Sequence, residues 1–219
     1  MCLEKKLSQV TAIAILPLKF DSYHLTAGGI REYNNTMSTA ARRQITSEVE
    51  RMLSKKGYNV TTLSDDRQHH RQWARMRHFY SVVNGQIENN VFGLGRFPSA
   101  DKMFAYSVPP ISDSLDNSTA DAFLFIDGFD DRATRKREKR KVAAAVGAAI
   151  GAALTGIYVT NSVPADRTFA SCALVNRWGE IIWYFLYTET GKIDMAQHAD
   201  CERFVSNLLG RLGKRQVQP

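Results

Sequence analysis

The sequence predicts a mixed α/β (α+β) fold, with a five-stranded sheet and helices packed on it, formed by a single domain over residues 1–219. A strand, a helix ending at glycine and a second strand follow one another over residues 11–63, the order of a parallel crossover unit. Two apolar segments flank an Asn-Arg-Trp-Gly turn at residues 176–179, which is typical of an antiparallel hairpin. The chain has 219 residues, of which 44% are hydrophobic, and this is enough to bury a core.

The first half of the predicted sheet is the crossover unit. Its first strand covers residues 11–20 (TAIAILPLKF), which are β-branched and apolar up to a proline. A helix over residues 38–56 follows, with Ser38 as its N-cap and Gly57 as its C-cap. The second strand covers residues 58–63. We expect the two strands to be parallel, with the helix over one face.

A second amphipathic helix begins at Asp65 and Asp66 and is expected to end at Asn84-Gly85. Its apolar face consists of Trp73, Met76, Tyr80 and Val83. Residues 93–110 are rich in glycine, proline and aromatic residues, which predicts a long, partly helical connection.

Three strands and a helix complete the predicted fold. The strands cover residues 120–129 (ADAFLFIDGF), 168–175 and 180–187, and the glycine between the last two accepts the positive φ that a tight turn requires. The closing helix covers residues 194–212. Its apolar side consists of Phe204, Val205, Leu208, Leu209 and Leu212.

An Ala/Gly-rich insertion, predicted to be helical, separates the third and fourth strands at residues 132–167. Residues 132–141 (RATRKREKRK) are nearly all basic and hold much of the formal net charge of +7, whereas residues 142–159 contain no charged residue. As a helix, residues 142–163 would be roughly 33 Å long, enough to cross a bilayer core of about 30 Å. Alanine and glycine contribute little to membrane insertion but allow another helix to approach closely.

The insertion holds two groups of predicted membrane or oligomer contacts. The basic side chains can be attracted to anionic lipid, and they are Arg135, Lys136, Arg137, Lys139, Arg140 and Lys141. The small residues can pack against a neighbouring subunit, and they are Gly147, Gly151 and Gly156. Three interpretations stay open: a buried helix or loop covering the sheet, helix packing between subunits, and contact with a bilayer. The basic run can equally be a solvated helical turn. Trp178, at the hairpin tip, is a further candidate contact with a partner or a headgroup layer.

The three cysteines form no CxxC pair and have no zinc-ligand spacing. Cys172 and Cys201 are expected to be buried thiols or to form one bridge. Residues 1–9 contain no recognisable signal peptide, so we expect the chain to be cytoplasmic or to have lost a leader. A cysteine directly after the first methionine is what remains when a lipoprotein leader is replaced by a start codon. Cys2 is therefore the candidate lipidation site.

The nearest approach to a metal cluster is a group of carboxylates and imidazoles early in the second helix, and it consists of Asp65, Asp66, His69 and His70. It lacks a convincing third ligand, since His78 is two turns further along, so no metal is predicted. Gly28-Gly29 lacks the spacing of a phosphate-binding loop, and no cofactor is predicted.

A cluster of carboxylates ends the third strand, where open α/β sheets often place ligands. Asp127, Asp130 and Asp131 could serve acid–base chemistry there, or simply balance Arg132 and its neighbours. The second role is favoured, and no catalytic residue is predicted.

Four short stretches resemble one family of proteins. They are an opening strand ending in proline (IAILPL), a helix ending in KKGYNV, a strand introduced by Ala-Asp (ADAFLFIDG), and a hairpin reading LVNRWGEIIW before a closing helix. Together they resemble envelope lipoproteins related to the curli secretion channel. The layout is also similar to the amino-terminal domain of the Tol-Pal propeller protein and to the Pel polysaccharide export lipoprotein. The resemblance covers residues 11–63 and 120–212. It implies a lipid-anchored periplasmic protein that forms rings or attaches to other envelope components.

The sequence thus predicts a non-catalytic bacterial envelope lipoprotein, periplasmic and anchored to the outer membrane through Cys2. We expect it to form a homo-oligomer or to dock onto a secretion, export or envelope-maintenance complex, with no nucleic acid as partner. The basic and apolar insertion is expected to add membrane contact. Two alternatives stay open: a cytoplasmic nucleic-acid-binding protein that uses the basic run on phosphates, and a small enzyme that uses Asp127 and Asp130.

Overall fold

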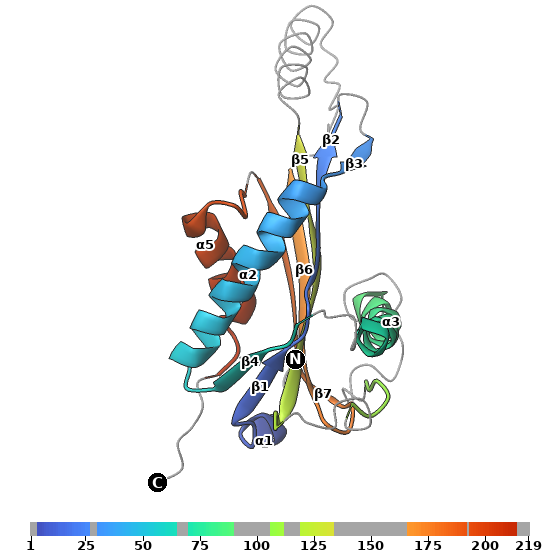
Figure 1. Cartoon of the computed structure of the whole chain (residues 1–219), viewed down its shortest axis with the longest axis vertical. Coiled ribbons are helices and arrows are strands. Elements are labelled where there is room, and N and C mark those ends of the chain that lie inside the picture. The colour runs from blue at the N-terminus through green and yellow to red at the C-terminus, as the bar shows by residue number, and fades with distance from the viewer. Residues whose placement is uncertain are drawn as a thin grey trace, which may run out of the picture.

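The computed structural model describes residues 4–26, 30–64, 70–89, 106–111, 119–133, 166–191 and 193–213. Within these residues a mixed sheet of seven strands carries helices on both faces, which confirms the predicted fold class (Figure 1). The strands are β1 (Ala12–Ile15), β2 (Lys19–Leu25), β3 (Arg31–Tyr33), β4 (Asn59–Thr62), β5 (Ala122–Ala133), β6 (Arg167–Asn176) and β7 (Ile181–Thr190). The helices are α1 (Glu4–Leu7), α2 (Asn35–Lys55), α3 (His70–Ile87) and α5 (His198–Leu209).

The long strand β5 organises the sheet. One of its edges pairs in parallel with β1, where Ile13 lies opposite Ala122, and further along with β2, where Lys19 lies opposite Asp127. The other edge pairs antiparallel with β6 over almost its whole length. The first predicted strand is therefore two strands placed end to end. Pro17 separates them because its nitrogen cannot donate to the ladder.

The sheet has seven strands where five were predicted. The division at Pro17 adds one strand, and β3 is the other. It is a short, exposed edge strand that pairs antiparallel with β2, with Tyr33 opposite Tyr23. The crossover unit itself is as expected. β1 and β4 pair in parallel, with Ala12 opposite Asn59, and α2 connects them through β2 and β3.

The antiparallel half also follows the prediction. β6 and β7 are joined by a tight turn in which Gly179 has a φ of 85°. No other residue fits that turn, because a Cβ at this position would lie 2.0 Å from the carbonyl oxygen of Val108.

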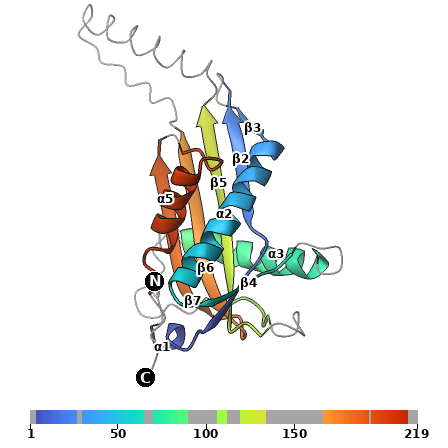
Figure 2. The same cartoon turned by 60° about the vertical axis from the view of Figure 1, so that its left-hand side comes forward.

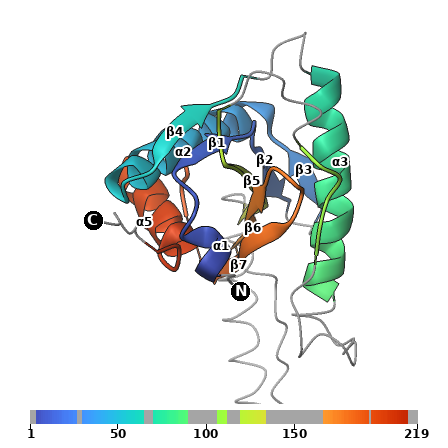
Figure 3. The same cartoon turned by 90° about the horizontal axis from the view of Figure 1, so that it is seen from below.

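Helices α2 and α5 lie side by side on one face of the sheet, and α3 crosses the lower half of the opposite face (Figures 2 and 3). The first core lies under α2 and α5 and contains Ile45, Leu124 and Phe204. The second lies under α3 and contains Trp73 and Tyr80. The predicted apolar side of the closing helix is buried as expected: Phe204, Val205, Leu208, Leu209 and Leu212. None of the helices that the structure describes has both the length and the apolar character to cross a membrane.

Predicted boundaries are wrong in three helices. The closing helix, predicted over residues 194–212, covers only His198–Leu209. Helix α2 begins one turn early, with Asn34 as N-cap, because the Asn34 side chain accepts the Met37 N–H at 2.9 Å. Ser38 is instead buried in the first turn, where its hydroxyl accepts the Ser22 N–H at 2.9 Å. Helix α3 continues through Asn84 and Gly85 to Ile87. Gly57 does end α2 as predicted, with a φ of 93° just beyond its C-cap.

Candidate functional site

The structure tests the placement of few of the predicted contact residues. Cys2 lies outside the described residues. So do the basic side chains Arg135, Lys136, Arg137, Lys139, Arg140 and Lys141 and the small residues Gly147, Gly151 and Gly156. Trp178 is described, and so are both ends of the segment that contains the other two groups.

Trp178 lies at the tip of the β6–β7 hairpin with 73% of its surface exposed. The backbone around it is held by the Asn176 side chain, whose oxygen accepts the N–H groups of Trp178 and Glu180, each at 3.0 Å. The turn is thus fixed while the indole ring stays in solvent. An exposed tryptophan on a fixed turn is suited to contact another surface.

The amino-terminal helix α1 lies against the same hairpin. The Lys6 ammonium donates to both carboxylate oxygens of Glu180, at 2.7 and 2.8 Å, and the Asn176 amide donates to Glu180 at 2.7 Å. The hydrogen bonds from Lys6 and Asn176 lower the pKa of Glu180. Helix α1 therefore lies at the end of the molecule that carries Trp178.

The insertion starts and ends at the opposite end of the sheet. Its two flanking residues are tied together, because the Asp166 carboxylate accepts the Ala133 N–H at 2.6 Å. β5 runs from Ala122, beside the hairpin, to Ala133, which at about 3.3 Å per residue is roughly 36 Å. Trp178 and the two residues that flank the insertion thus lie toward opposite ends of β5.

The predicted boundaries of the insertion need correction. Arg132 and Ala133 belong to β5, and Arg167 belongs to β6, so the ladder extends further than the sequence indicated. Arg132, the first residue of the basic run, is also not exposed to solvent as a solvated helical turn would require. Its guanidinium is only 15% exposed and forms ion pairs with Asp130 at 2.6 Å and Asp194 at 2.8 Å.

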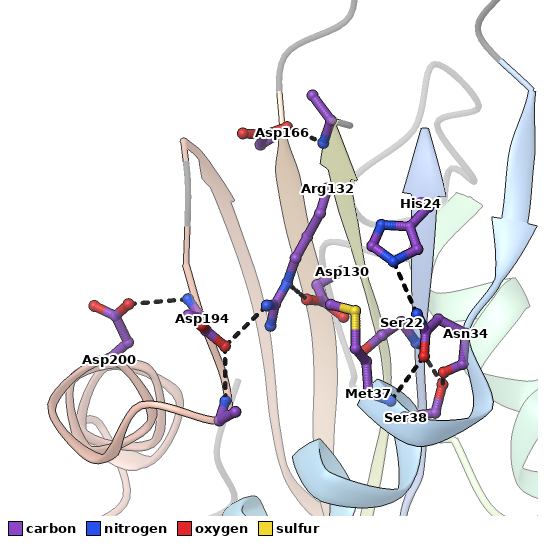
Figure 4. A network of polar contacts seen from close by, with 12 residues as sticks. Ser22, His24, Asn34, Met37, Ser38, Asp130, Arg132, Asp166, Asp194 and Asp200 are labelled. Carbon is purple, nitrogen blue, oxygen red and sulfur yellow. Dashed lines mark hydrogen bonds and ion pairs between the residues drawn. The ribbon is translucent and has the colours of Figure 1, made fainter. Parts of the chain in front are cut away.

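Arg132 and its partners form a buried polar network between the sheet and α5 (Figure 4). Asp130 is 1% exposed; burial raises the pKa of its carboxyl group, and the neighbouring Ser22 hydroxyl and Arg132 oppose that rise. Asp194 accepts the Ala196 N–H at 3.0 Å, and its own N–H donates to Asp200 at 2.9 Å. The network therefore fixes the segment before α5 to the end of β5.

The three aspartates that suggested an active site do not converge. Asp130 faces α2 and α5, whereas Asp127 and Asp131 project from the other face of β5 because strand side chains alternate. Asp131 accepts from the Arg31 guanidinium at 2.7 Å. Asp130 pairs with Arg132, as predicted, whereas Asp131 pairs with Arg31 of β3, and Asp127 pairs with none among the described residues.

Asp127 lines a cavity of about 360 Å³ that sequence reasoning missed. The cavity lies on the α3 side of the sheet, between β2, β5, β6 and the end of α3, and its other walls include Lys19, Tyr23, Glu88 and Phe129. The alternation in residues 19–25 (KFDSYHL) could have indicated a polar face on β2. Nothing in the sequence indicated that the end of α3 would meet it.

Most of the residues considered as possible metal ligands cannot be placed in the structure. Asp65, Asp66 and His69 lie outside the described residues, as does the side chain of His70, and His78 is exposed on α3. Among the described side chains, no three His, Cys, Asp or Glu residues lie together as metal ligands would. Cys172 and Cys201 are both buried free thiols, so of the two expectations for them the bridge is wrong.

Comparisons with known proteins give no family. No protein family model matches the chain, and no curated protein matches it. Among solved structures, the chain is similar to the PelC dodecamer from Paraburkholderia phytofirmans. The two are 11% identical, the match covers 94% of this chain and 90% of that one, and the TM-score is 0.42.

Proposed function

We propose that this chain is a non-catalytic protein of the bacterial envelope, held at the outer membrane by lipid on Cys2, which assembles with copies of itself or with an envelope complex. The observation that carries the proposal is the ion pair between Lys6 and Glu180, which holds the amino-terminal helix against the hairpin that exposes Trp178. A lipid anchor and an interfacial tryptophan at one end of a domain would together orient it on a bilayer.

The opposite end of the domain is then directed away from the membrane. The basic and Ala/Gly-rich insertion begins and ends there, beside Ala133 and Asp166. In this arrangement we assign the insertion to contacts with protein, either neighbouring copies or a docking complex, and the hairpin end to contact with lipid. The small residues of the insertion suit close helix packing better than they suit insertion into lipid.

Vesicle flotation of the full chain tests the membrane end. Replacing Trp178 by Ser is expected to weaken binding to anionic vesicles by about tenfold, because an aromatic side chain no longer leaves water at the interface. Ile30→Ser is the matched control, since Ile30 is an exposed apolar residue (68%) that follows β2, at the other end of the sheet. Equal binding by the two variants would remove the hairpin from the proposal.

Lipid on Cys2 needs a separate measurement. When the chain is expressed behind a lipoprotein leader, we expect the mass of the mature protein to include the acyl groups and the membrane fraction to contain it. Cys2→Ser should release it to the soluble fraction, because one apolar side chain cannot replace several acyl chains. A mature protein without added mass would contradict the anchoring part of the proposal.

A further inference from the structure

The cavity beside Asp127 has the features of a ligand site. Its volume of about 360 Å³ is within the range of small-molecule sites, and it lies on a face of the sheet that α3 covers only in part. Charged, amide and aromatic side chains from five elements line it, namely β2, β3, β5, β6 and α3. Such convergence of polar groups in a partly apolar cavity is what a small ligand requires.

Most charged groups around the cavity already have partners. Arg42 contacts Asp21 at 3.3 Å, and Arg31 is paired with Asp131. Asp127 differs from them, because its carboxylate has no hydrogen bond or ion pair among the described residues. Burial raises the pKa of Asp127 to about 6, and the more distant charges of Lys19 and Arg77 oppose that rise. A desolvated carboxylate facing a cavity is a group that a cationic ligand would stabilise.

A second carboxylate is held in position at the cavity. The hydroxyl groups of Tyr184 and Tyr80 donate to the Asn84 side-chain oxygen at 2.8 and 3.5 Å, which fixes the orientation of that amide. The Asn84 amide then donates to Glu88 at 2.7 Å. Both tyrosines are buried, so this chain of hydrogen bonds extends from the core to the cavity wall. It prepositions Glu88 as an acceptor beside Asp127.

Aromatic rings form the remaining wall. Phe129 stacks on Phe169 with ring centroids 5.4 Å apart, and the Arg31 guanidinium lies 4.4 Å from the Phe129 centroid and 4.2 Å from that of Tyr23. This face of the sheet thus already holds one cation between aromatic rings and a carboxylate, Asp131. Asp127 lines the same cavity as Phe129 and Phe169, and no ion pair joins it to a cation of the described residues.

We propose that this cavity binds a small organic ammonium ion, with the ammonium group on Asp127, Glu88 as a further acceptor, and the apolar part of the ligand against Phe129 and Phe169. The assignment does not depend on lipid at Cys2 or on the insertion, so it can fail without affecting the proposed function. Hydrogen bonds between an ammonium and a carboxylate in a partly dry site are strong enough to select a cation over a neutral molecule of the same shape.

Calorimetric titration of the full chain with benzylamine tests the proposal, because this probe combines one primary ammonium with one aromatic ring. We expect a dissociation constant of about 1 mM or tighter near neutral pH. Benzyl alcohol, which has the same ring and no charge, is expected to bind at least about tenfold more weakly. Absence of saturable benzylamine binding, or equal binding of the alcohol, would overturn the proposal.

Two variants locate the bound ammonium. Asp127→Asn keeps the shape of the side chain and should weaken benzylamine binding by about tenfold or more. Asp21→Asn is the matched control, since Asp21 lies on the same cavity but already pairs with Arg42, and its affinity should stay within about twofold of the wild type. Equal losses in the two variants would show a general effect of charge rather than a site at Asp127.

The pH dependence gives an independent readout. Affinity should be constant between about pH 7 and about pH 8, where the probe is still an ammonium ion, and fall as the pH drops through about 6, because protonated Asp127 no longer pairs with the ammonium. The other charged groups facing Asp127 are Lys19, Asp21, Arg77 and Glu88. Since burial also raises the pKa of Glu88, the Asp127→Asn variant must show a smaller dependence than the wild type. An unchanged profile in that variant would contradict the assignment.

Discussion

At the scale of single residues, the ionised carboxylate of Asp127 is expected to lower the free energy of unfolding. Its folded-state pKa of about 6 exceeds the ordinary value of 3.8, so the folded chain holds this proton more tightly than the unfolded chain does. The contribution of Asp127 to the free energy of unfolding is greatest below about pH 4, and it is lost as the pH rises through about 6. Asp127→Asn should therefore raise the free energy of unfolding by about 3 kcal/mol at about pH 8 and by less than about 1 kcal/mol at about pH 4. Urea denaturation at several pH values measures this, and a gain independent of pH would refute it.

Among the arginines of the described residues, Arg132 is the one whose substitution we expect to reduce stability most. Arg132→Met leaves the Asp130 carboxylate buried without its cation and should lower the free energy of unfolding by about 3 kcal/mol at neutral pH. Arg203→Met is the control, because Arg203 is 52% exposed and its ion pairs are 3.5 Å long, so it should cost less than about 1 kcal/mol. Similar losses in both variants would show that the buried network is not important for stability.

The sequence placed three aspartates at the end of a strand over residues 120–129, whereas β5 continues to Ala133 and contains all three. The sequence could also have shown that their side chains lie on different faces. Side chains alternate along a strand, and positions 127 and 130 differ by an odd number, so they face opposite sides of the sheet. The partners of Asp127 and Asp130 could not be predicted. Asp194 reaches the Arg132 that pairs with Asp130 from the segment before α5, and Glu88 approaches Asp127 from the end of α3.

At the scale of elements, two glycines give opposite predictions. Gly179→Ala should destabilise the protein by about 2 kcal/mol or more, because its φ of 85° is unfavourable for alanine and its Cβ would overlap the Val108 carbonyl oxygen. Gly85→Ala should stabilise it by about 0.5 kcal/mol, since Gly85 lies inside α3 with no atom within 4 Å of the added Cβ. Thermal unfolding of both variants compares the two, and a loss at Gly85 would mean that the end of α3 is not helical in solution.

The hairpin and the closing helix were predictable because local chemistry determines them. A glycine at the turn and an apolar stripe at helical spacing leave few other conformations. The break at Pro17 was visible in the sequence, yet the continuation of the strand beyond it was not, since β2 depends on a partner more than a hundred residues away. The start of α2 was missed for a similar reason. Ser38 is a good capping residue, but burial against Ser22 uses its hydroxyl elsewhere.

At the scale of the whole molecule, the two ends of β5 are expected to have separable roles. Replacing residues 134–165 by Asn-Gly should preserve the fold, because Ala133 and Asp166 are already adjacent and this loop length closes a hairpin readily. If the insertion mediates assembly as proposed, the shortened chain should have a smaller mass in light scattering than the full chain. Its binding to anionic vesicles should remain, whereas Trp178→Ser should show the reverse pattern.

Circular dichroism and thermal unfolding of the shortened chain serve as the control for folding. An unchanged particle mass in a folded shortened chain would exclude the insertion from assembly. Loss of vesicle binding in the same protein would assign the membrane contact to the basic segment instead of to the hairpin.

The bond between the Ala133 N–H and the Asp166 carboxylate also bears on how such a protein can diversify. Where two strands of a hairpin are already joined at their base, the entropy of closing the loop between them grows only slowly with its length. Segments of very different size and chemistry could therefore be inserted between these two residues with little change in the free energy of folding. Related proteins could then differ in the segment between β5 and β6 while keeping the sheet and the hairpin end that carries the tryptophan.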